Sequence, residues 1–217
     1  MKKIYGWIIG LILLSFVLAG VFLTLAPDVV PVHYGVGGNV DCWGSKYELL
    51  LLPAISLLGG AVMLLTGKFG TKGEPQNERV VGVITIWMLI LFNGLWAFFM
   101  VKALQGGTVH ANLSEQSMKW VSMALFGSFI PLGNLMPKVK RNSMLGFRTK
   151  WSMANDVCWQ KSQRLAGFCM VSTGIVGIAV TAIAPADWSV WILLGLIGVS
   201  VIVLSIGSYL IYKRETA

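Results

Sequence analysis

The chain of 217 residues is rich in apolar residues and poor in charge, with 56% hydrophobic and 12% charged residues. About a quarter of the residues of an ordinary soluble domain are charged, so this composition excludes a typical soluble globular protein. The formal net charge is +8, but the basic residues lie between and beside long apolar runs. This placement is typical of residues that orient a membrane protein, so we expect contact with membrane lipid and no direct nucleic-acid partner.

Six apolar runs approach or exceed the length that a helix needs to cross a membrane, about 20 residues. The first run follows Lys2 and Lys3 as a signal peptide would, but it is long enough to span and no small-residue cleavage site closes it. We therefore expect it to be retained. The sequence predicts an all-α membrane protein with six transmembrane helices, at about residues 4–25, 47–67, 80–101, 120–136, 165–184 and 188–212.

The basic residues divide unequally between the two sides of this arrangement. If both termini are cytoplasmic, 14 of the 17 Lys and Arg residues face the cytoplasm, and only Lys46, Lys102 and Lys119 face outward. Cytoplasmic loops of membrane proteins carry such an excess of Lys and Arg. The sequence therefore predicts that both termini are cytoplasmic. Four tryptophans fall near the predicted outer interface, as in an aromatic belt: Trp43, Trp120, Trp188 and Trp191.

Three units follow from the order of the runs. Residues 1–70 form an N-terminal two-helix unit with an outer loop at 26–46. Residues 71–119 contain the third helix and its flanking loops. Residues 120–217 form a three-helix unit whose basic inner loop covers 137–164, and we call these residues the basic loop.

The outer loop, residues 26–46, is rich in turn residues and aromatic side chains. Pro27 and Pro31 favour an extended path, and three glycines allow tight turns. We expect the loop to fold onto the outer membrane face. His33, Asp41 and Asp28 could be metal ligands, but a zinc site needs three or four well-placed nitrogen or sulfur ligands. The pattern favours a structural hydrogen-bonding role for His33 and Asp41.

Between their ends the apolar runs contain no Asp, Glu, Lys, Arg or His, and Glu48 lies at the edge of the second run. Ion-coupled pumps and proton relays usually need such groups at membrane depth, so the sequence argues against this class of transporter. It also contains no nucleophile elbow, no zinc-protease motif and no paired carboxylates. We expect no enzymatic activity, no cofactor and no metal.

The basic loop carries seven Lys and Arg residues against one acid, Asp156. Ser152 is a reasonable helix N-cap, and Asp156 would then lie near the positive end of that helix. Trp151 and Trp159 indicate a short helix at the inner interface, ahead of the fifth span. Arg148 could satisfy free carbonyls at helix C-termini. We favour such a structural lock over a docking face for a cytoplasmic partner.

Two motifs in the chain resemble a known family. The first combines N-x-x-P, N-x-x-x-G-x-R-T-x-W-[ST] and a later Trp and Gly, and it resembles the SdpI family, the immunity proteins of the sporulation-delaying-protein toxin system. Lys150 and Ser152 stand where many members have Pro and Thr. The matching residues are Asn134, Pro137, Asn142, Gly146, Arg148, Thr149, Trp151, Ser152, Trp159 and Gly167.

The second motif lies in the outer loop, where P-x-x-x-P-x-H is followed by D-x-W-G-S-K. It is similar to the companion domain of unknown function at the N-terminus of these proteins. The matching residues are Pro27, Pro31, His33, Asp41, Trp43, Gly44, Ser45 and Lys46.

The resemblance implies a bacterial integral membrane protein that protects its host from a secreted, membrane-active peptide toxin. It further implies a toxin-sensing receptor that holds a cytoplasmic transcriptional repressor at the membrane. We expect the inner motif to act as a structural lock or to dock that repressor. The alternatives are a small exporter of a hydrophobic peptide and an envelope-stress membrane protein without a toxin ligand. We expect the toxin to contact His33, Tyr34, Asp41, Trp43 and Lys46.

Overall fold

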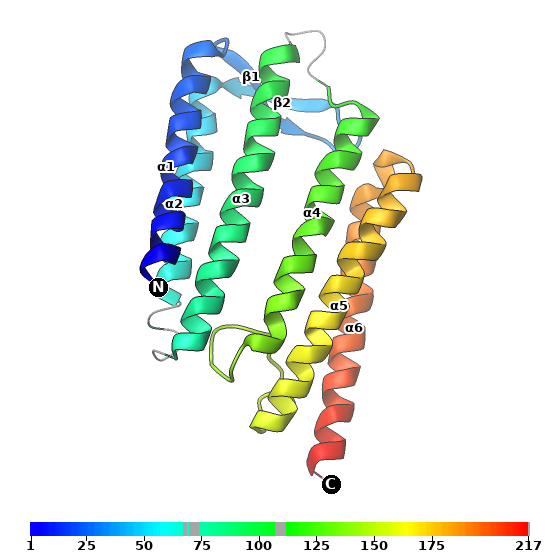
Figure 1. Cartoon of the computed structure of the whole chain (residues 1–217). Coiled ribbons are helices and arrows are strands. Elements are labelled where there is room, and N and C mark those ends of the chain that lie inside the picture. Colours follow the sequence, from blue (N-terminus) through cyan, green and yellow to red (C-terminus); the bar gives the residue numbers. More distant parts are fainter. Residues whose placement is uncertain (67–68, 70–73, 107–111, 217) are drawn as a thin grey trace.

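The structure, a computed structural model, describes residues 1–66, 69, 74–106 and 112–216. Within these residues it consists mainly of long helices that run side by side, with one small β-hairpin at one end (Figure 1). The helices are α1 (Lys2–Leu25), α2 (Leu51–Leu65), α3 (Pro75–Gly106), α4 (Glu115–Leu135), α5 (Asp156–Ile183) and α6 (Ser189–Thr216). The strands are β1 (Val29–Tyr34) and β2 (Val40–Ser45).

The helices alternate in direction, so the hairpin and the basic loop lie at opposite ends of the bundle (Figure 1). Both chain termini lie at the same end of the bundle as the basic loop. Helix α1 packs against α2 and α3, whereas α5 packs between α4 and α6. The arrangement agrees with the predicted alternation of six apolar runs, and it places the two sequence motifs at the two ends of the molecule.

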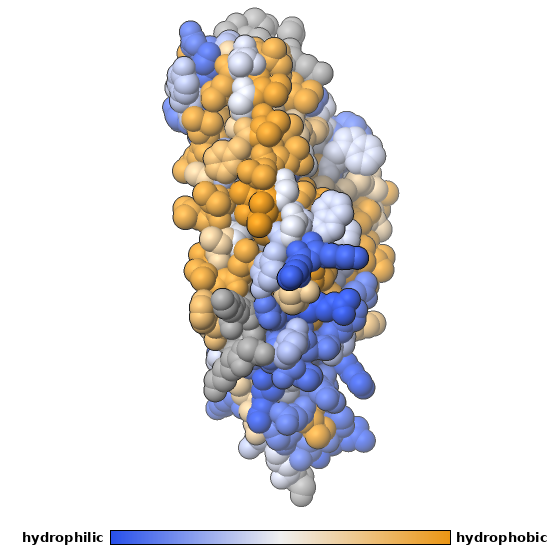
Figure 2. All heavy atoms as spheres, turned by 60° about the vertical axis from the view of Figure 1, so that its left-hand side comes forward, coloured by the Kyte–Doolittle hydropathy of each residue, from blue (hydrophilic) through white to orange (hydrophobic). Residues whose placement is uncertain are grey.

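Five of the helical segments are long and apolar enough to cross a membrane. Helix α4 is not among them, although it runs alongside the others (Figure 1). Its 21 residues give a length of about 32 Å, but Glu115, Lys119, Asn134 and several serines lower its hydropathy. By length and composition, the chain therefore supports five of the six predicted spans. Figure 2 shows the apolar side chains over the helices and the hydrophilic ones gathered toward the end of the basic loop.

The outer loop forms an antiparallel hairpin rather than an extended path alone. The register pairs Val29 with Ser45 and Pro31 with Trp43, and it is irregular around His33. Proline is tolerated because each strand of a two-stranded sheet has a free edge. After β2, a short 3-10 helix (Lys46–Leu50) leads into α2. This 3-10 helix begins with a capping box, in which the side chains of Ser45 and Glu48 each bond the backbone of the other residue. The expectation of an all-α fold is corrected in this detail.

Helices α4 and α5 approach closely because glycines face each other. A Cβ atom on Gly167 would lie 2.6 Å from the Gly133 carbonyl oxygen and 3.1 Å from Pro137. Only glycine leaves room for two helix backbones at such a distance. This contact gives a physical reason for two positions of the first motif, Pro137 and Gly167.

Candidate functional site

The hairpin is attached to the outer ends of the helices by apolar contacts. Val30 is fully buried in a cluster with Phe22 of α1 and Trp96 and Met100 of α3. A two-stranded hairpin is at best marginally stable alone, so this packing is what holds it. Two further bonds connect it to the segment before α4, from the Leu113 amide to the Gly38 carbonyl (2.8 Å) and from the Val40 amide to the Asn112 side chain (2.9 Å).

His33 and Asp41 form a hydrogen-bonded pair across the hairpin, with 2.6 Å between His33 Nδ1 and Asp41 Oδ1. The structural hydrogen-bonding role expected for these residues is thereby confirmed. Both side chains are more than half exposed, so the pair presents a polar group at the outer surface.

Tyr34, the next residue of β1, turns toward the helices. Its ring stacks on Phe99 of α3 with 5.5 Å between ring centroids. Burial raises the pKa of the Tyr34 phenol. Among the described residues, its buried hydroxyl has no hydrogen-bond partner.

A cavity of about 520 Å³ lies where the hairpin meets α3, α4 and the start of α6. We call it the outer cavity. His33, Tyr34 and Asp41 line it, so the structure brings three of the five predicted toxin-contact residues together. Its other lining residues are mostly apolar and include Phe99, Met118, Val121, Leu125, Phe126 and Leu193.

The other two predicted contact residues lie outside this cavity. Lys46 is paired with Asp28 (3.0 Å) and its side chain is only 17% exposed. Trp43 lies opposite Pro31 on the hairpin and is 40% exposed. Trp43 therefore remains accessible at the surface, whereas Lys46 fastens the base of the hairpin.

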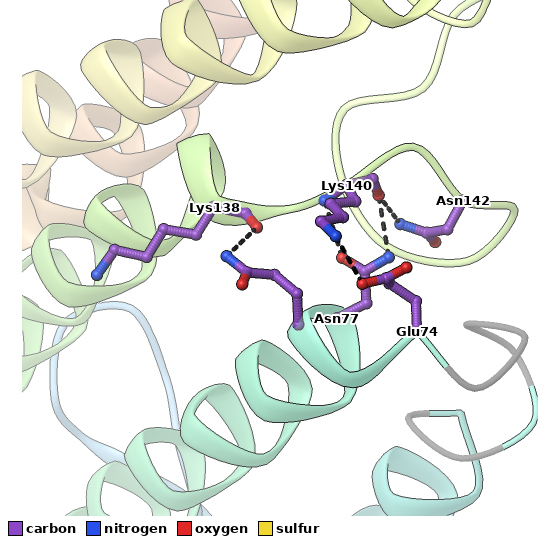
Figure 3. A network of polar contacts seen from close by, with 6 residues as sticks. Glu74, Asn77, Lys138, Lys140 and Asn142 are labelled. Atoms are coloured by element: carbon purple, nitrogen blue, oxygen red, sulfur yellow. Dashed lines mark hydrogen bonds and ion pairs between the residues drawn. The ribbon is translucent and has the colours of Figure 1, made fainter.

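At the opposite end, the basic loop is bonded to the start of α3 (Figure 3). The Asn77 side chain, fully buried, accepts from the Lys140 amide (2.8 Å) and donates to the Lys140 carbonyl (3.0 Å). Glu74 pairs with the Lys140 ammonium group at 2.8 Å. This hydrogen bond holds the pKa of the Glu74 carboxyl below its ordinary value. We call the contacts of Glu74 and Asn77 with Lys140 the inner clasp.

Asn142 of the motif folds the basic loop on itself. Its side-chain oxygen accepts from the amides of Met144 (2.7 Å) and Leu145 (2.6 Å). Its amide group donates to the carbonyls of Lys140 (2.8 Å) and Leu145 (3.1 Å). Four bonds from one side chain explain why the pattern requires an amide here.

Gly146 and Gln163 form the next contact. Gly146 has φ +110°, and a Cβ atom there would lie 2.8 Å from Gln163 Oε1 and 2.9 Å from the Trp159 ring. Gln163 is fully buried. It accepts from the Phe147 amide (3.0 Å) and donates to the Phe147 carbonyl (2.9 Å). Glycine is therefore needed both for its backbone conformation and for the approach of α5.

Thr149 and Ser152 close a turn rather than starting a helix. The Thr149 amide donates to Ser152 Oγ (2.8 Å), and the Ser152 amide donates to Thr149 Oγ1 (3.0 Å). The Thr149 hydroxyl also bonds Ser208 of α6 (2.8 Å). The prediction of Ser152 as an N-cap is wrong: the cap is Asn155, whose side chain accepts from the Cys158 amide (2.8 Å). Asp156 does lie in the first helical turn.

The two tryptophans of the motif have different roles. Trp151 packs edge-on against Tyr209 of α6, with 5.3 Å between ring centroids. Trp159 is 1% exposed and donates from Nε1 to the Val139 carbonyl at 2.7 Å. The short interfacial helix predicted around them is not formed, because α5 is continuous over Asp156–Ile183. Trp159 thus belongs to the core, not to the interface.

Arg148 and Asn134 differ from the rest of the motif. Both are exposed, and among the described residues neither side chain makes a hydrogen bond or ion pair. The proposed bond from Arg148 to free helix carbonyls is therefore not seen. The residues that do fasten the basic loop are Asn77, Asn142, Ser152, Trp159 and Gln163.

Sequence reasoning missed Asn77 and Gln163, which carry much of this network. Gln163 lies four residues after Trp159, on the same face of α5, and a polar residue at that spacing from a buried tryptophan is a usable signal. Asn77 gives no local signal, since its partner Lys140 is 63 residues away.

Comparisons with known proteins agree with the resemblance. Residues 138–208 match the SdpI/YfhL protein family, and residues 10–57 match a domain of unknown function, DUF1648. The second range includes the whole hairpin. No solved structure matches the chain.

Two relatives extend this finding. The chain is 21% identical over 206 residues to Immunity protein SdpI of Bacillus subtilis, covering 94% of this chain and 93% of that protein. It is 45% identical over 42 residues to an uncharacterized protein of Archaeoglobus fulgidus, covering 19% of this chain and 23% of that protein. The C-terminal part of the chain is therefore similar to the SdpI/YfhL family and the N-terminal part to DUF1648, in a chain that resembles Immunity protein SdpI over nearly its whole length.

Proposed function

We propose that the protein is an immunity protein of the bacterial cytoplasmic membrane, with both termini cytoplasmic, that confers resistance to a secreted, membrane-active peptide toxin. The likeness to a protein named for immunity supports this function. The structural observation that best supports the immunity function is the position of the hairpin, at the end of the bundle opposite the basic loop. The excess of basic residues on the basic-loop side supports the orientation.

The hairpin suits an apolar peptide partner because it is already ordered by its contacts. Val30 is buried and Tyr34 is stacked on Phe99, so little conformational entropy is lost on binding. Trp43 and the His33–Asp41 pair offer exposed aromatic and polar contacts. The toxin would therefore be bound at the outer face before it inserts into the bilayer.

The inner motif serves first as a structural lock. Asn142, Gly146, Thr149, Ser152 and Trp159 all contact the loop itself or neighbouring helices, as described above. A receptor function, in which a cytoplasmic repressor docks at this end, would use Arg148. Its exposure is the observation that favours this second function. Copurification of a repressor with the wild type, lost with Arg148→Ala at an equal protein level, would support it.

Survival of toxin-sensitive bacteria tests the immunity function. Cells that express the wild type are challenged with the sporulation-delaying peptide and compared with cells expressing Trp43→Ala and Arg148→Ala. We expect wild type and Arg148→Ala to protect, and Trp43→Ala to lose protection while its level in the membrane is unchanged. Equal survival of the Trp43→Ala cells would reject the hairpin as the contact surface. Protection that disappears when the proton gradient is dissipated would indicate export instead.

A further inference from the structure

We infer that the outer cavity binds a non-acidic, aromatic-rich segment of the peptide, two to three residues long. The inference rests on the proposed function, because it takes the occupant to be the peptide toxin. With a volume of about 520 Å³, the cavity falls within the usual range of roughly 300–1,000 Å³ for small-molecule sites. It is therefore large enough for more than one side chain.

The walls of the cavity favour aromatic groups. Phe99, Phe126 and Met118 line it together with Tyr34. Aromatic rings and a methionine sulfur contact other rings with favourable geometry, beyond the gain from burying apolar area. The walls alone would also accept an acyl chain of a lipid, so they do not decide the occupant.

Two buried hydroxyl groups decide between a peptide and an acyl chain. Tyr34 and Ser189 both line the cavity. Ser189 is 4% exposed, and within the described residues neither hydroxyl has a hydrogen-bond partner. A buried hydroxyl without a partner carries a free-energy cost that a hydrogen-bonding ligand removes. An indole N–H or a peptide group can do so, whereas an acyl chain cannot.

The charges around the cavity exclude an acidic segment. No Lys or Arg is found among the described residues that line it, and the carboxylate of Asp41 stands at its hairpin side, paired with His33. An acidic side chain would meet this carboxylate without a Lys or Arg to neutralise it. The segment that enters therefore carries no acidic residue.

Calorimetric titration of the full-length protein in lipid nanodiscs tests this assignment, with empty nanodiscs as the blank. The probes are N-acetyl-Leu-Trp-Leu-amide, N-acetyl-Leu-Glu-Leu-amide and decane, which has no hydrogen-bonding group. We expect saturable binding of the Trp peptide only. Loss of one hydrogen bond in Tyr34→Phe or Ser189→Ala should weaken it about three- to tenfold.

Two variants on the same helix provide the matched comparison. Ser122 lines the cavity and Met123 does not, so Ser122→Phe should abolish binding while Met123→Phe leaves it unchanged. Equal heats in wild type and Ser122→Phe would show partition into lipid only and overturn the inference. Saturable binding of decane without the Trp peptide would assign the cavity to a lipid chain and would also overturn it.

The outcome is separable from the immunity function. Cells that remain protected by wild type and by Ser122→Phe alike would retain the proposed function and reject the cavity as its site. A wild type that binds the Trp peptide but protects no cells would reject the immunity function alone.

Discussion

Single residues of the family motif are explained by backbone geometry and hydrogen bonding rather than by exposed chemistry. Gly146 adopts a positive φ and lies against Gln163 and Trp159. Asn142, Ser152 and Trp159 satisfy polar groups of the basic loop. Buried polar groups are costly when unpaired, so these positions accept few other residues. Arg148 and Asn134 are the exceptions, and of these two Arg148 is the residue proposed above for docking a partner.

Gly146→Ala tests the geometric explanation at the residue scale. A side chain there would be strained at φ +110° and would approach Gln163 Oε1 at 2.8 Å. We expect a loss of about 1–3 kcal/mol in the free energy of unfolding, measured with denaturant in detergent micelles. Gly10→Ala is the control, since a Cβ atom at Gly10 meets nothing within 4 Å. Equal effects of the two changes would contradict the explanation.

The pH dependence of stability tests the Glu74–Lys140 contact. The pKa of Glu74 is lowered from 4.5 by its bond to Lys140, so the ionised carboxylate is favoured in the folded protein. The contribution of the ionised Glu74 to the stability of the fold is complete above pH 4.5. This contribution is lost as the pH falls through the lower pKa that Glu74 has in the folded state. We expect the melting temperature of Glu74→Gln to fall less steeply than that of the wild type over this acid range. If the melting temperatures of the wild type and Glu74→Gln fall in parallel as the pH is lowered, the contact contributes nothing to stability.

At the scale of elements, hydropathy and charge were sufficient for most of the fold. The apolar runs were predicted because each is long and nearly uncharged. The hairpin was not recognised as strands, because Pro31 and the glycines obscure the alternation of residues. The start of α5 was misplaced because Ser152 and Asn155 are both suitable caps, and only the turn between Thr149 and Ser152 selects Asn155. The inner clasp joins distant segments and leaves no local pattern.

Helix α4 gives a prediction at the same scale. Because it packs alongside α5, we expect α4 to cross the membrane as the sixth predicted span, although its hydropathy is low. In a Cys42→Ser background, Glu115→Cys should react with a membrane-impermeant maleimide on intact cells, and Lys138→Cys only after the cells are opened. The buried Cys158 and Cys169 should not contribute. Reaction of both engineered cysteines from the same side would mean that α4 does not cross.

For the whole molecule, the two ends are built differently. The inner end is a hydrogen-bonded network that includes the inner clasp and the bonds of Asn142, Gln163 and Trp159, beside a cavity of about 920 Å³ lined largely by polar and charged residues. The outer end has an exposed hairpin and a mostly apolar cavity, and two buried hydroxyls in that cavity have no hydrogen-bond partner among the described residues. A fully satisfied network is suited to holding a fold, whereas unsatisfied groups beside a cavity are suited to binding. This asymmetry is the central argument for placing toxin contact at the outer face.

Membrane potential after toxin challenge tests this placement most directly. Sensitive cells expressing wild type, Trp43→Ala or Arg148→Ala at matched levels are loaded with a potential-sensitive dye and exposed to the sporulation-delaying peptide. Contact at the outer face predicts that the potential holds with wild type and Arg148→Ala and collapses with Trp43→Ala as in empty cells. If Arg148→Ala collapses while Trp43→Ala holds, protection acts from the inner face and the account is wrong.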